Sequence, residues 1–221
     1  MIQIESYISE LITLLQSEFS EQLLYVGLQG SYLRGEATES SDVDIMVVLE
    51  ELSPLDLARY RNIIKNLPHY DLSCGFICSR RDLAAWNSLE ICNLLHSTKD
   101  YFGNLADLVK AYNKDDVRNY VKISLNNLYH EICHRYIHGS REKNEQALPF
   151  SYKCVFFILQ NLHFLRQGVF IGTKAELLAQ LTAKDHAVLQ RSMELNRGIP
   201  HDFDGSFELL FDWCQETLQT L

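Results

Sequence analysis

Two apolar segments, residues 23–28 and 43–49, enclose a polar stretch that begins with a glycine–serine pair at Gly30 and ends with Asp42 and Asp44. Each apolar segment has the length and composition of a buried strand. A glycine directly after a strand lets the backbone turn sharply and lets a ligand approach without a Cβ in the way. The pattern therefore predicts two strands, with a tight turn after the first and an acidic pair at the start of the second.

The acidic pair points to a cation. Asp42 and Asp44 are two residues apart on the expected strand, so their carboxylates project from one face. Two such charges in a partly dry site repel each other unless a cation lies between them. Mg²⁺ suits this place, because it takes a couple of carboxylates and completes its shell with water and phosphate oxygens. Ser31 offers a hydroxyl and an N–H group at the expected start of a short helix, where an anion is favoured. The residues thus predict a metal-dependent phosphate-transfer site.

In this order, and with a strand on each side, these residues resemble the signature of the nucleotidyltransferase superfamily, the DNA polymerase beta-like enzymes. That signature is a Gly-Ser pair followed by an Asp-x-Asp with apolar flanks. The resemblance implies that Asp42 and Asp44 bind one or two Mg²⁺ ions and that ATP is the default co-substrate. The nucleotide-binding residues that it implies in this part of the chain are Gly30, Ser31, Arg34 and Ser41.

The family also uses a third carboxylate on a later strand, and Asp71 is our candidate for it. Asp71 stands at the start of an apolar stretch that follows a helix-like segment, residues 53–67. Alternation predicts a strand with two faces, a polar one with Asp71, Ser73 and Gly75 and an apolar one with Leu72, Cys74 and Phe76. By resemblance, Asp71 completes the metal site or accepts the proton of the attacking hydroxyl. The alternative is that it only caps the strand after the turn at Pro68.

Composition limits the class of protein. The chain has 221 residues, of which 47% are hydrophobic and 22% charged, as expected of a soluble globular protein with one large or two small domains. We expect no secretory signal and no membrane span, because residues 4–19 have the spacing of an amphipathic helix. The six cysteines include no CxxC pair, which favours a cytoplasmic protein. We expect a monomer or a homodimer. The net charge of −9 opposes a nucleic-acid partner and mildly favours a small, cationic acceptor.

From about residue 103 the alternation of strand and helix patterns gives way to helical periodicity. We therefore expect a nucleotidyltransferase domain over residues 1–103 and a C-terminal helical bundle over residues 104–221. Bundle helices are predicted from Asp115 or Asp116 to about His138, from Pro149 to Gln167, from the Thr173/Glu176 capping box, from about Lys184, and from about Ser206 to the end. The fold class is α+β: a small mixed β-sheet with flanking helices, followed by an all-α antiparallel bundle.

Lys153 is the candidate binding residue of the bundle. It would lie near the first turn of the helix that Pro149 is expected to open, where the helix dipole disfavours a cation. No residue three or four positions away can form an ion pair with it. The lysine would then bind the triphosphate, or else it is a solvated side chain. The segment 149–170 resembles a helix of aminoglycoside-type adenylyltransferases, and this resemblance implies that Lys153 binds phosphate.

A competing pattern lies in the same bundle, where His130, Glu131 and His134 spell the HExxH sequence of zinc proteases. Arg135 places a charge where such helices are usually apolar, and the extended pattern with a third histidine six residues on is absent. His138 merely continues the spacing of four residues. The alternatives are a histidine stripe that lines the acceptor pocket and a plain face of the bundle.

These observations together predict an enzyme that moves a nucleoside monophosphate, by default AMP from ATP, onto a hydroxyl of a small acceptor such as an antibiotic-like molecule. Pyrophosphate is the second product. Two alternatives stay open: transfer onto a protein or an RNA, as in antitoxin-like members of the superfamily, and a non-catalytic nucleotide sensor. Pockets for different acceptors are built from scattered side chains, so the sequence does not identify the acceptor.

Overall fold

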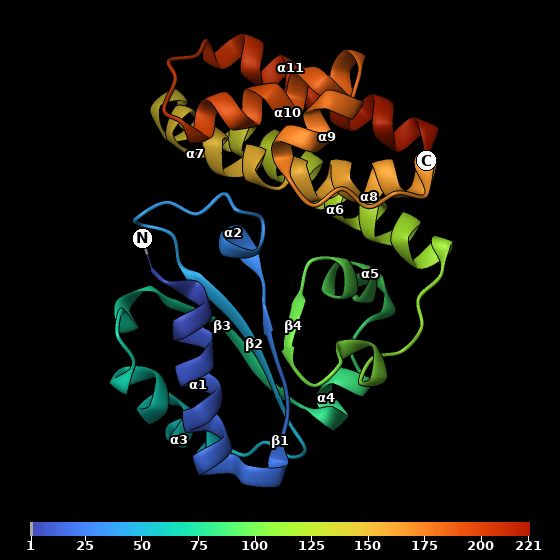
Figure 1. Ribbon diagram of the computed structural model, residues 1–221. Helices are drawn as coiled ribbons and strands as arrows, with labels where there is room; N and C mark the ends of the chain where they lie inside the picture. The colour runs from blue at the N-terminus through green and yellow to red at the C-terminus, as the bar shows by residue number, and fades with distance from the viewer. Residues whose placement is uncertain (1) are drawn as a thin grey trace. The chain divides into compact units, whose positions relative to one another are not determined.

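The computed structural model describes residues 2–221, which fold into two compact units, Met1–Tyr112 and Asn113–Leu221 (Figure 1). Residues 104–112 belong to the first unit, because Leu105 in this segment is buried among its core side chains. The boundary that we expected after residue 103, between the nucleotidyltransferase domain and the helical bundle, stays a prediction.

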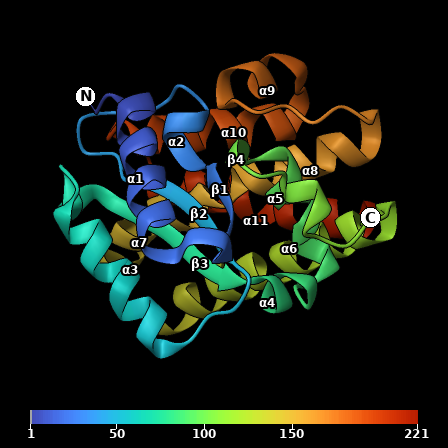
Figure 2. The same cartoon turned by 60° about the horizontal axis from the view of Figure 1, so that its bottom comes forward.

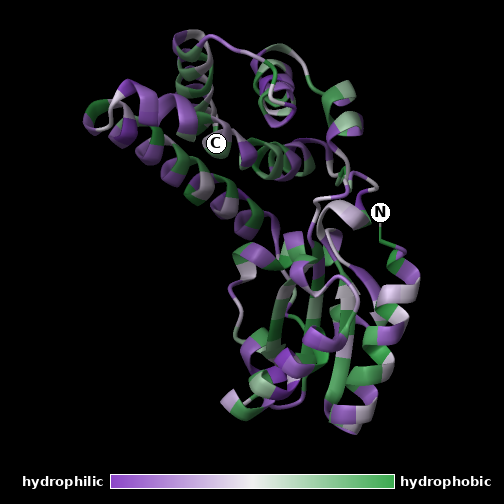
Figure 3. Ribbon diagram, turned by 90° about the vertical axis from the view of Figure 1, so that its left-hand side faces the viewer, coloured by the Kyte–Doolittle hydropathy of each residue, from purple (hydrophilic) through white to green (hydrophobic). Residues whose placement is uncertain are grey.

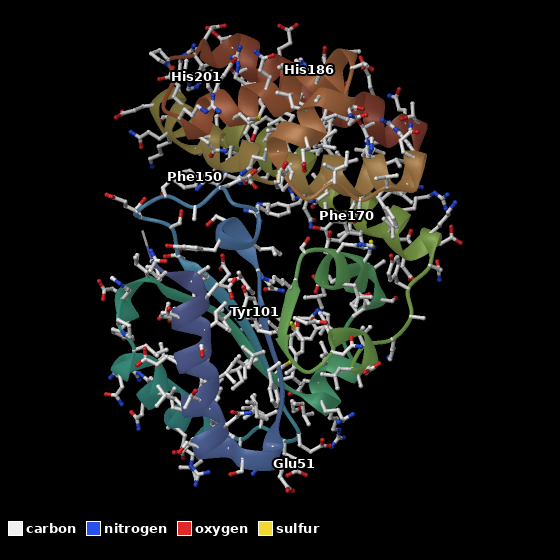
Figure 4. All side chains as sticks on the ribbon, viewed as in Figure 1. Glu51, Tyr101, Phe150, Phe170, His186 and His201 are labelled. Carbon is white, nitrogen blue, oxygen red and sulfur yellow. The ribbon has the colours of Figure 1, made fainter. Side chains whose placement is uncertain are left out.

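The first unit is built on a mixed sheet of order β3-β2-β1-β4. Its strands are β1 (Leu23–Leu28), β2 (Val43–Leu49), β3 (Ser73–Ser79) and β4 (Lys99–Phe102). β1 runs antiparallel to β2 and β4, whereas β2 and β3 are parallel. The C-terminal end of β1 and the N-terminal ends of the other strands therefore meet at one end of the sheet. Glu51, directly after β2, marks the opposite end (Figure 4).

Helices cover both faces of this sheet (Figures 1 and 2). One face carries α1 (Ile4–Phe19) and α3 (Pro54–Asn66), whose apolar side chains share a buried cluster with alternate residues of β1 and β2. The other face carries α4 (Arg80–Ala84) and α5 (Ser88–His96), which pack against Met46 and Val48. Because both faces of the sheet are covered there, β1 and β2 are apolar along most of their length, and green residues accordingly run through the strands in Figure 3.

Local sequence signals account for where several of these helices begin. Ser53 and Asp56 form a capping box at the start of α3, and Ser79 and Asp82 form another at the start of α4. Four short helices complete the unit, and these are η1 (Ser20–Gln22), α2 (Gly30–Leu33), η2 (Tyr70–Leu72) and η3 (Leu105–Asp107).

The second unit is entirely helical within the described residues. Its helices are α6 (Lys114–His138), α7 (Arg141–Lys153), α8 (Val155–Gln167), α9 (Lys174–Gln180), α10 (Ala183–Asn196) and α11 (Phe203–Thr220). They enclose one large apolar core, in which Trp213 and Tyr152 are fully buried. The α+β class expected from the sequence is thereby confirmed. All six cysteines are free thiols, and no helix within residues 2–221 meets the length and apolarity that a bilayer crossing requires.

Pro149 does not open a helix, contrary to the sequence-based expectation. It lies inside α7, whose first turn is capped by Ser140 through a hydrogen bond from the Lys143 N–H group at 3.4 Å. Leu148 and Tyr152 are both buried in the bundle core. Their burial holds α7 together across the proline, although proline removes one helical hydrogen bond. The next helix, α8, starts after Cys154.

Replacement of this proline tests its place in the helix. We expect Pro149→Ala to raise the free energy of unfolding by about 1–2 kcal/mol, because alanine restores the missing hydrogen bond. The greater freedom of the unfolded chain offsets part of that gain. Pro54, at the first position of α3, is the matched control, and Pro54→Ala should be neutral or slightly destabilising. Urea unfolding measures both. Equal, near-zero effects would contradict a mid-helix Pro149.

Candidate functional site

The turn between β1 and α2 lies directly against the side chain of Asp44. Gly30 in this turn has a φ of +69°, and a Cβ built on it would lie 1.9 Å from Oδ2 of Asp44. The Gln29 N–H group donates a hydrogen bond of 2.9 Å to the Asp44 carbonyl oxygen. Ser31 follows at the start of α2. The structure thus brings Gly30 and Ser31 to the aspartate pair, and a side chain at position 30 would displace Asp44.

The two aspartates differ in their surroundings. Asp42 is exposed, whereas Asp44 is partly buried. Burial raises the pKa of the Asp44 carboxyl, and the charge of Asp42 raises it further. A hydrogen bond from the Cys74 thiol and the nearby Arg34 guanidinium oppose that rise. A partly dry carboxylate with a like charge beside it is stabilised by a cation, so this pair of hard oxygen donors fits Mg²⁺.

Two further candidates lie on the loop between the strands. Arg34 directs its Nε to Oε2 of Glu36 at 3.0 Å, and its side chain is 16% exposed. Its charge also acts on Asp44, which places a cation at this end of the sheet. The Ser41 hydroxyl accepts a hydrogen bond of 2.8 Å from the Thr38 N–H group, so it stabilises its own loop. The assignment of Arg34 and Ser41 as nucleotide-binding residues stays a prediction.

The residue beside Asp44 on the neighbouring strand is Cys74. β2 and β3 pair with Asp44 opposite Cys74, and residues paired in this way project from the same face of a sheet. The thiol is exposed, and its presence beside Asp44 opposes the rise in the pKa of that carboxyl. The sequence analysis missed this residue and assigned it to an apolar face. Alternation shows which residues share a face, but it does not show which face meets the aspartates.

Asp71 is not part of this cluster. It lies in η2, before the first residue of β3, and is exposed. Ser73, on the same alternation, shares a hydrogen bond of 2.6 Å with the Tyr7 hydroxyl and therefore faces α1. Within residues 2–221, no three His, Cys, Asp or Glu side chains lie close enough together to hold a metal ion. The roles of Asp71 as a third metal ligand or as the proton acceptor stay predictions that rest on the resemblance.

Lys153 lies at the C-terminal end of α7 instead of near the start of a helix. The helix dipole favours a cation there, so the argument from an unfavourable dipole was wrong. The lysine Nζ lies 4.7 Å from the centroid of the Phe150 ring, within the range of a cation–π interaction. As a phosphate ligand, Lys153 stays a prediction that rests on the resemblance alone.

The HExxH residues lie on α6, but their geometry does not support a protease. His130, His134 and His138 are exposed along one stripe, with ring centroids 6.1 and 4.7 Å apart. Glu131, which would have to activate a water molecule, is instead paired with Arg135 at 3.0 Å. The stripe is therefore an exposed face of the helix.

Comparison with known proteins adds to this geometry. Residues 8–79 match the family model described as the nucleotidyltransferase domain. This chain contains a nucleotidyltransferase domain. The matched range includes the Gly30 turn and both aspartates. The expectation of a nucleotidyltransferase enzyme is thereby confirmed. A separate search of curated protein sequences found no match to the chain.

Among solved structures, the nucleotidyltransferase resembles spectinomycin adenyltransferase AAD(9) from Enterococcus faecialis, crystallised with ATP and spectinomycin. The sequences are 13% identical, the TM-score is 0.61, and the match covers 97% of this chain and 99% of that chain. At this identity the likeness establishes the fold. A toxin–antitoxin structure with AMP-PNP is 21% identical over 58% of this chain and 92% of that chain, but its TM-score of 0.33 is too low to support an argument.

The contact between Gly30 and Asp44 is open to a direct test. Gly30→Ala should weaken binding of Mg·AMP-PNP about tenfold or more, because the new methyl group displaces the Asp44 carboxylate. Gly35 is the matched control, since its φ is +67° but a Cβ there would meet nothing within 4 Å. Gly35→Ala pays only the backbone strain, about 1 kcal/mol. Calorimetric titration and urea unfolding compare the two variants, and equal losses in both would contradict the contact.

The raised pKa of Asp44 predicts that the Asp44→Asn variant is more stable than the parent, by an amount that depends on pH. Folding raises the pKa of this carboxyl, so its contribution to stability is present at low pH and is lost as the pH rises through the folded-state value. In EDTA at pH 7, Asp44→Asn should therefore raise the free energy of unfolding by roughly 0.5–1 kcal/mol. The gain should vanish as the pH falls toward 3.8, the ordinary value of this carboxyl. Melting curves at both pH values measure this effect, with Asp71→Asn as the exposed control. A lower stability of Asp44→Asn than of the parent at pH 7 would contradict the prediction.

Proposed function

We propose that this nucleotidyltransferase moves AMP from ATP onto a hydroxyl of a small acceptor and releases pyrophosphate. The observation that supports this most is the packing of the Gly30 turn against Asp44. It places a backbone turn with an adjacent hydroxyl, Ser31, beside a pair of carboxylates. Phosphate donors and metal ligands on adjoining elements are what a triphosphate bound with a divalent cation requires.

Each residue of the site has a role that follows from its chemistry. Asp42 and Asp44 would hold Mg²⁺, which when bound neutralises phosphate charge and favours attack at phosphorus. The Ser31 hydroxyl and the N–H groups that begin α2 donate to phosphate oxygens. Arg34 offers charge-assisted hydrogen bonds to the same anion. Positioning and electrostatic stabilisation supply most of the catalysis in reactions of this kind.

The reaction balances without a redox partner. A bond forms between the acceptor oxygen and the α-phosphorus, and the bond from that phosphorus to the bridging oxygen breaks. Pyrophosphate leaves with the electron pair, and the acceptor hydroxyl gives its proton to solvent water. The net charge of −9 favours a small, cationic acceptor over a polyanion. Fold likeness to a spectinomycin adenyltransferase does not transfer the substrate.

Pyrophosphate release from Mg·ATP in the presence of hydroxylated acceptors tests this function. We expect Asp44→Asn to lower the rate about 100-fold or more, the scale for loss of one electrostatic stabiliser. Asp71→Asn should stay within threefold of the parent, because Asp71 is exposed in η2, outside the strand that pairs with β2. Melting curves check that both variants fold.

Other results would redirect the proposal. Nucleotide binding without pyrophosphate release across a broad set of small acceptors would favour the nucleotide-sensor alternative. Loss of transfer in Asp71→Asn, with its fold intact, would return that residue to the site and contradict the placement described above.

A further inference from the structure

The aspartate pair has a thiol, not a third carboxylate, as its neighbour on the adjoining strand. Cys74 pairs with Asp44 across β2 and β3, so the two side chains project from the same face of the sheet, and Cys74 is exposed. Of the two glutamates on the nearby loop, Glu36 and Glu39, Glu36 is paired with Arg34 at 3.0 Å. Within residues 2–221, no further acidic side chain joins the pair within metal-binding reach.

Two carboxylates supply enough protein oxygen ligands for one hard cation. Mg²⁺ is usually held by one or two carboxylates together with water and phosphate oxygens. A two-metal site places its cations about 3.5–4 Å apart, so these repel each other and need anionic oxygens that reach both. A soft thiol is a poor substitute, because Mg²⁺ selects carboxylate, carbonyl and water ligands. The Arg34 charge that acts on Asp44 disfavours a second cation further.

We propose that Cys74 restricts this site to a single divalent cation. The inference rests on the nucleotidyltransferase function proposed above and specifies how its site is occupied. A carboxylate at position 74 would stand beside Asp44 and supply the oxygens that a second cation lacks. The side chain at position 74 therefore sets the number of cations bound with the nucleotide.

Mn²⁺ is the probe for this proposal, because it takes the same oxygen ligands as Mg²⁺ and is paramagnetic. The full chain is titrated with Mn²⁺ in the presence of equimolar AMP-PNP. Electron paramagnetic resonance then counts the bound ions and detects coupling between neighbouring ones. We expect one uncoupled Mn²⁺ per chain in the parent and two coupled ions in Cys74→Asp. Cys74→Ser, which matches the size of cysteine without adding a carboxylate, should keep one.

The outcomes separate this inference from the function on which it rests. A coupled Mn²⁺ pair in the parent would overturn the inference and leave the proposed function standing. A single ion in a folded Cys74→Asp protein would also overturn it, and Cys74→Glu serves if the aspartate variant does not fold. The metal site of the proposed function would instead be contradicted if Mn²⁺ bound to the protein with AMP-PNP no more tightly than to AMP-PNP alone, and if this affinity were unchanged in Asp44→Asn.

Discussion

The close approach of the Gly30 backbone to the Asp44 carboxylate is the constraint on which the site depends. It requires that β1 end where β2 begins, and the antiparallel pairing of Leu28 with Ile45 provides this. Val26 and Val47, paired in the same register, are completely buried. A slip of one residue would turn these side chains out of the core and Asp44 into it, at a cost of several kcal/mol. The hydrophobic core therefore fixes the geometry of the polar site.

Features that depend on neighbouring residues were predictable from the sequence. The amphipathic helix over residues 4–19, the two apolar strands, the helical segment after Ser53 and the cap at Thr173 all appear in the structure where the patterns place them. Each arises from hydrogen bonds or side-chain periodicity within a few positions. The approach of the Gly30 turn to the aspartates was also predictable, because a glycine–serine pair after one strand and an acidic pair at the start of another form a pattern with a known chemical use.

Features that depend on pairing between distant segments were not predictable in this way. Cys74, which the sequence did not indicate as a site residue, lies opposite Asp44 because β3 pairs with β2 in this register, and the two strands are separated in the chain by α3. Pro149 shows the same limit in the bundle, where burial of Leu148 and Tyr152 outweighs the local tendency of proline to end a helix. This error also reversed the interpretation of Lys153, because the sign of the dipole interaction depends on which end of a helix is nearest.

The charge of the protein and the charge of its ligand are compatible for a local reason. A net charge of −9 opposes a triphosphate at long range, but salt screens exposed charges beyond about 8 Å under physiological conditions. Near the site, Arg34 attracts phosphate while Asp42 and Asp44 repel it. In the proposed site, a cation held by the aspartates would reverse that repulsion, and a bound phosphate would in turn strengthen the binding of the cation. Because coupling between two bound ligands is reciprocal, nucleotide and cation each depend on the other for affinity. Burial raises the pKa of Asp44, and the neighbouring charge of Asp42 raises it further.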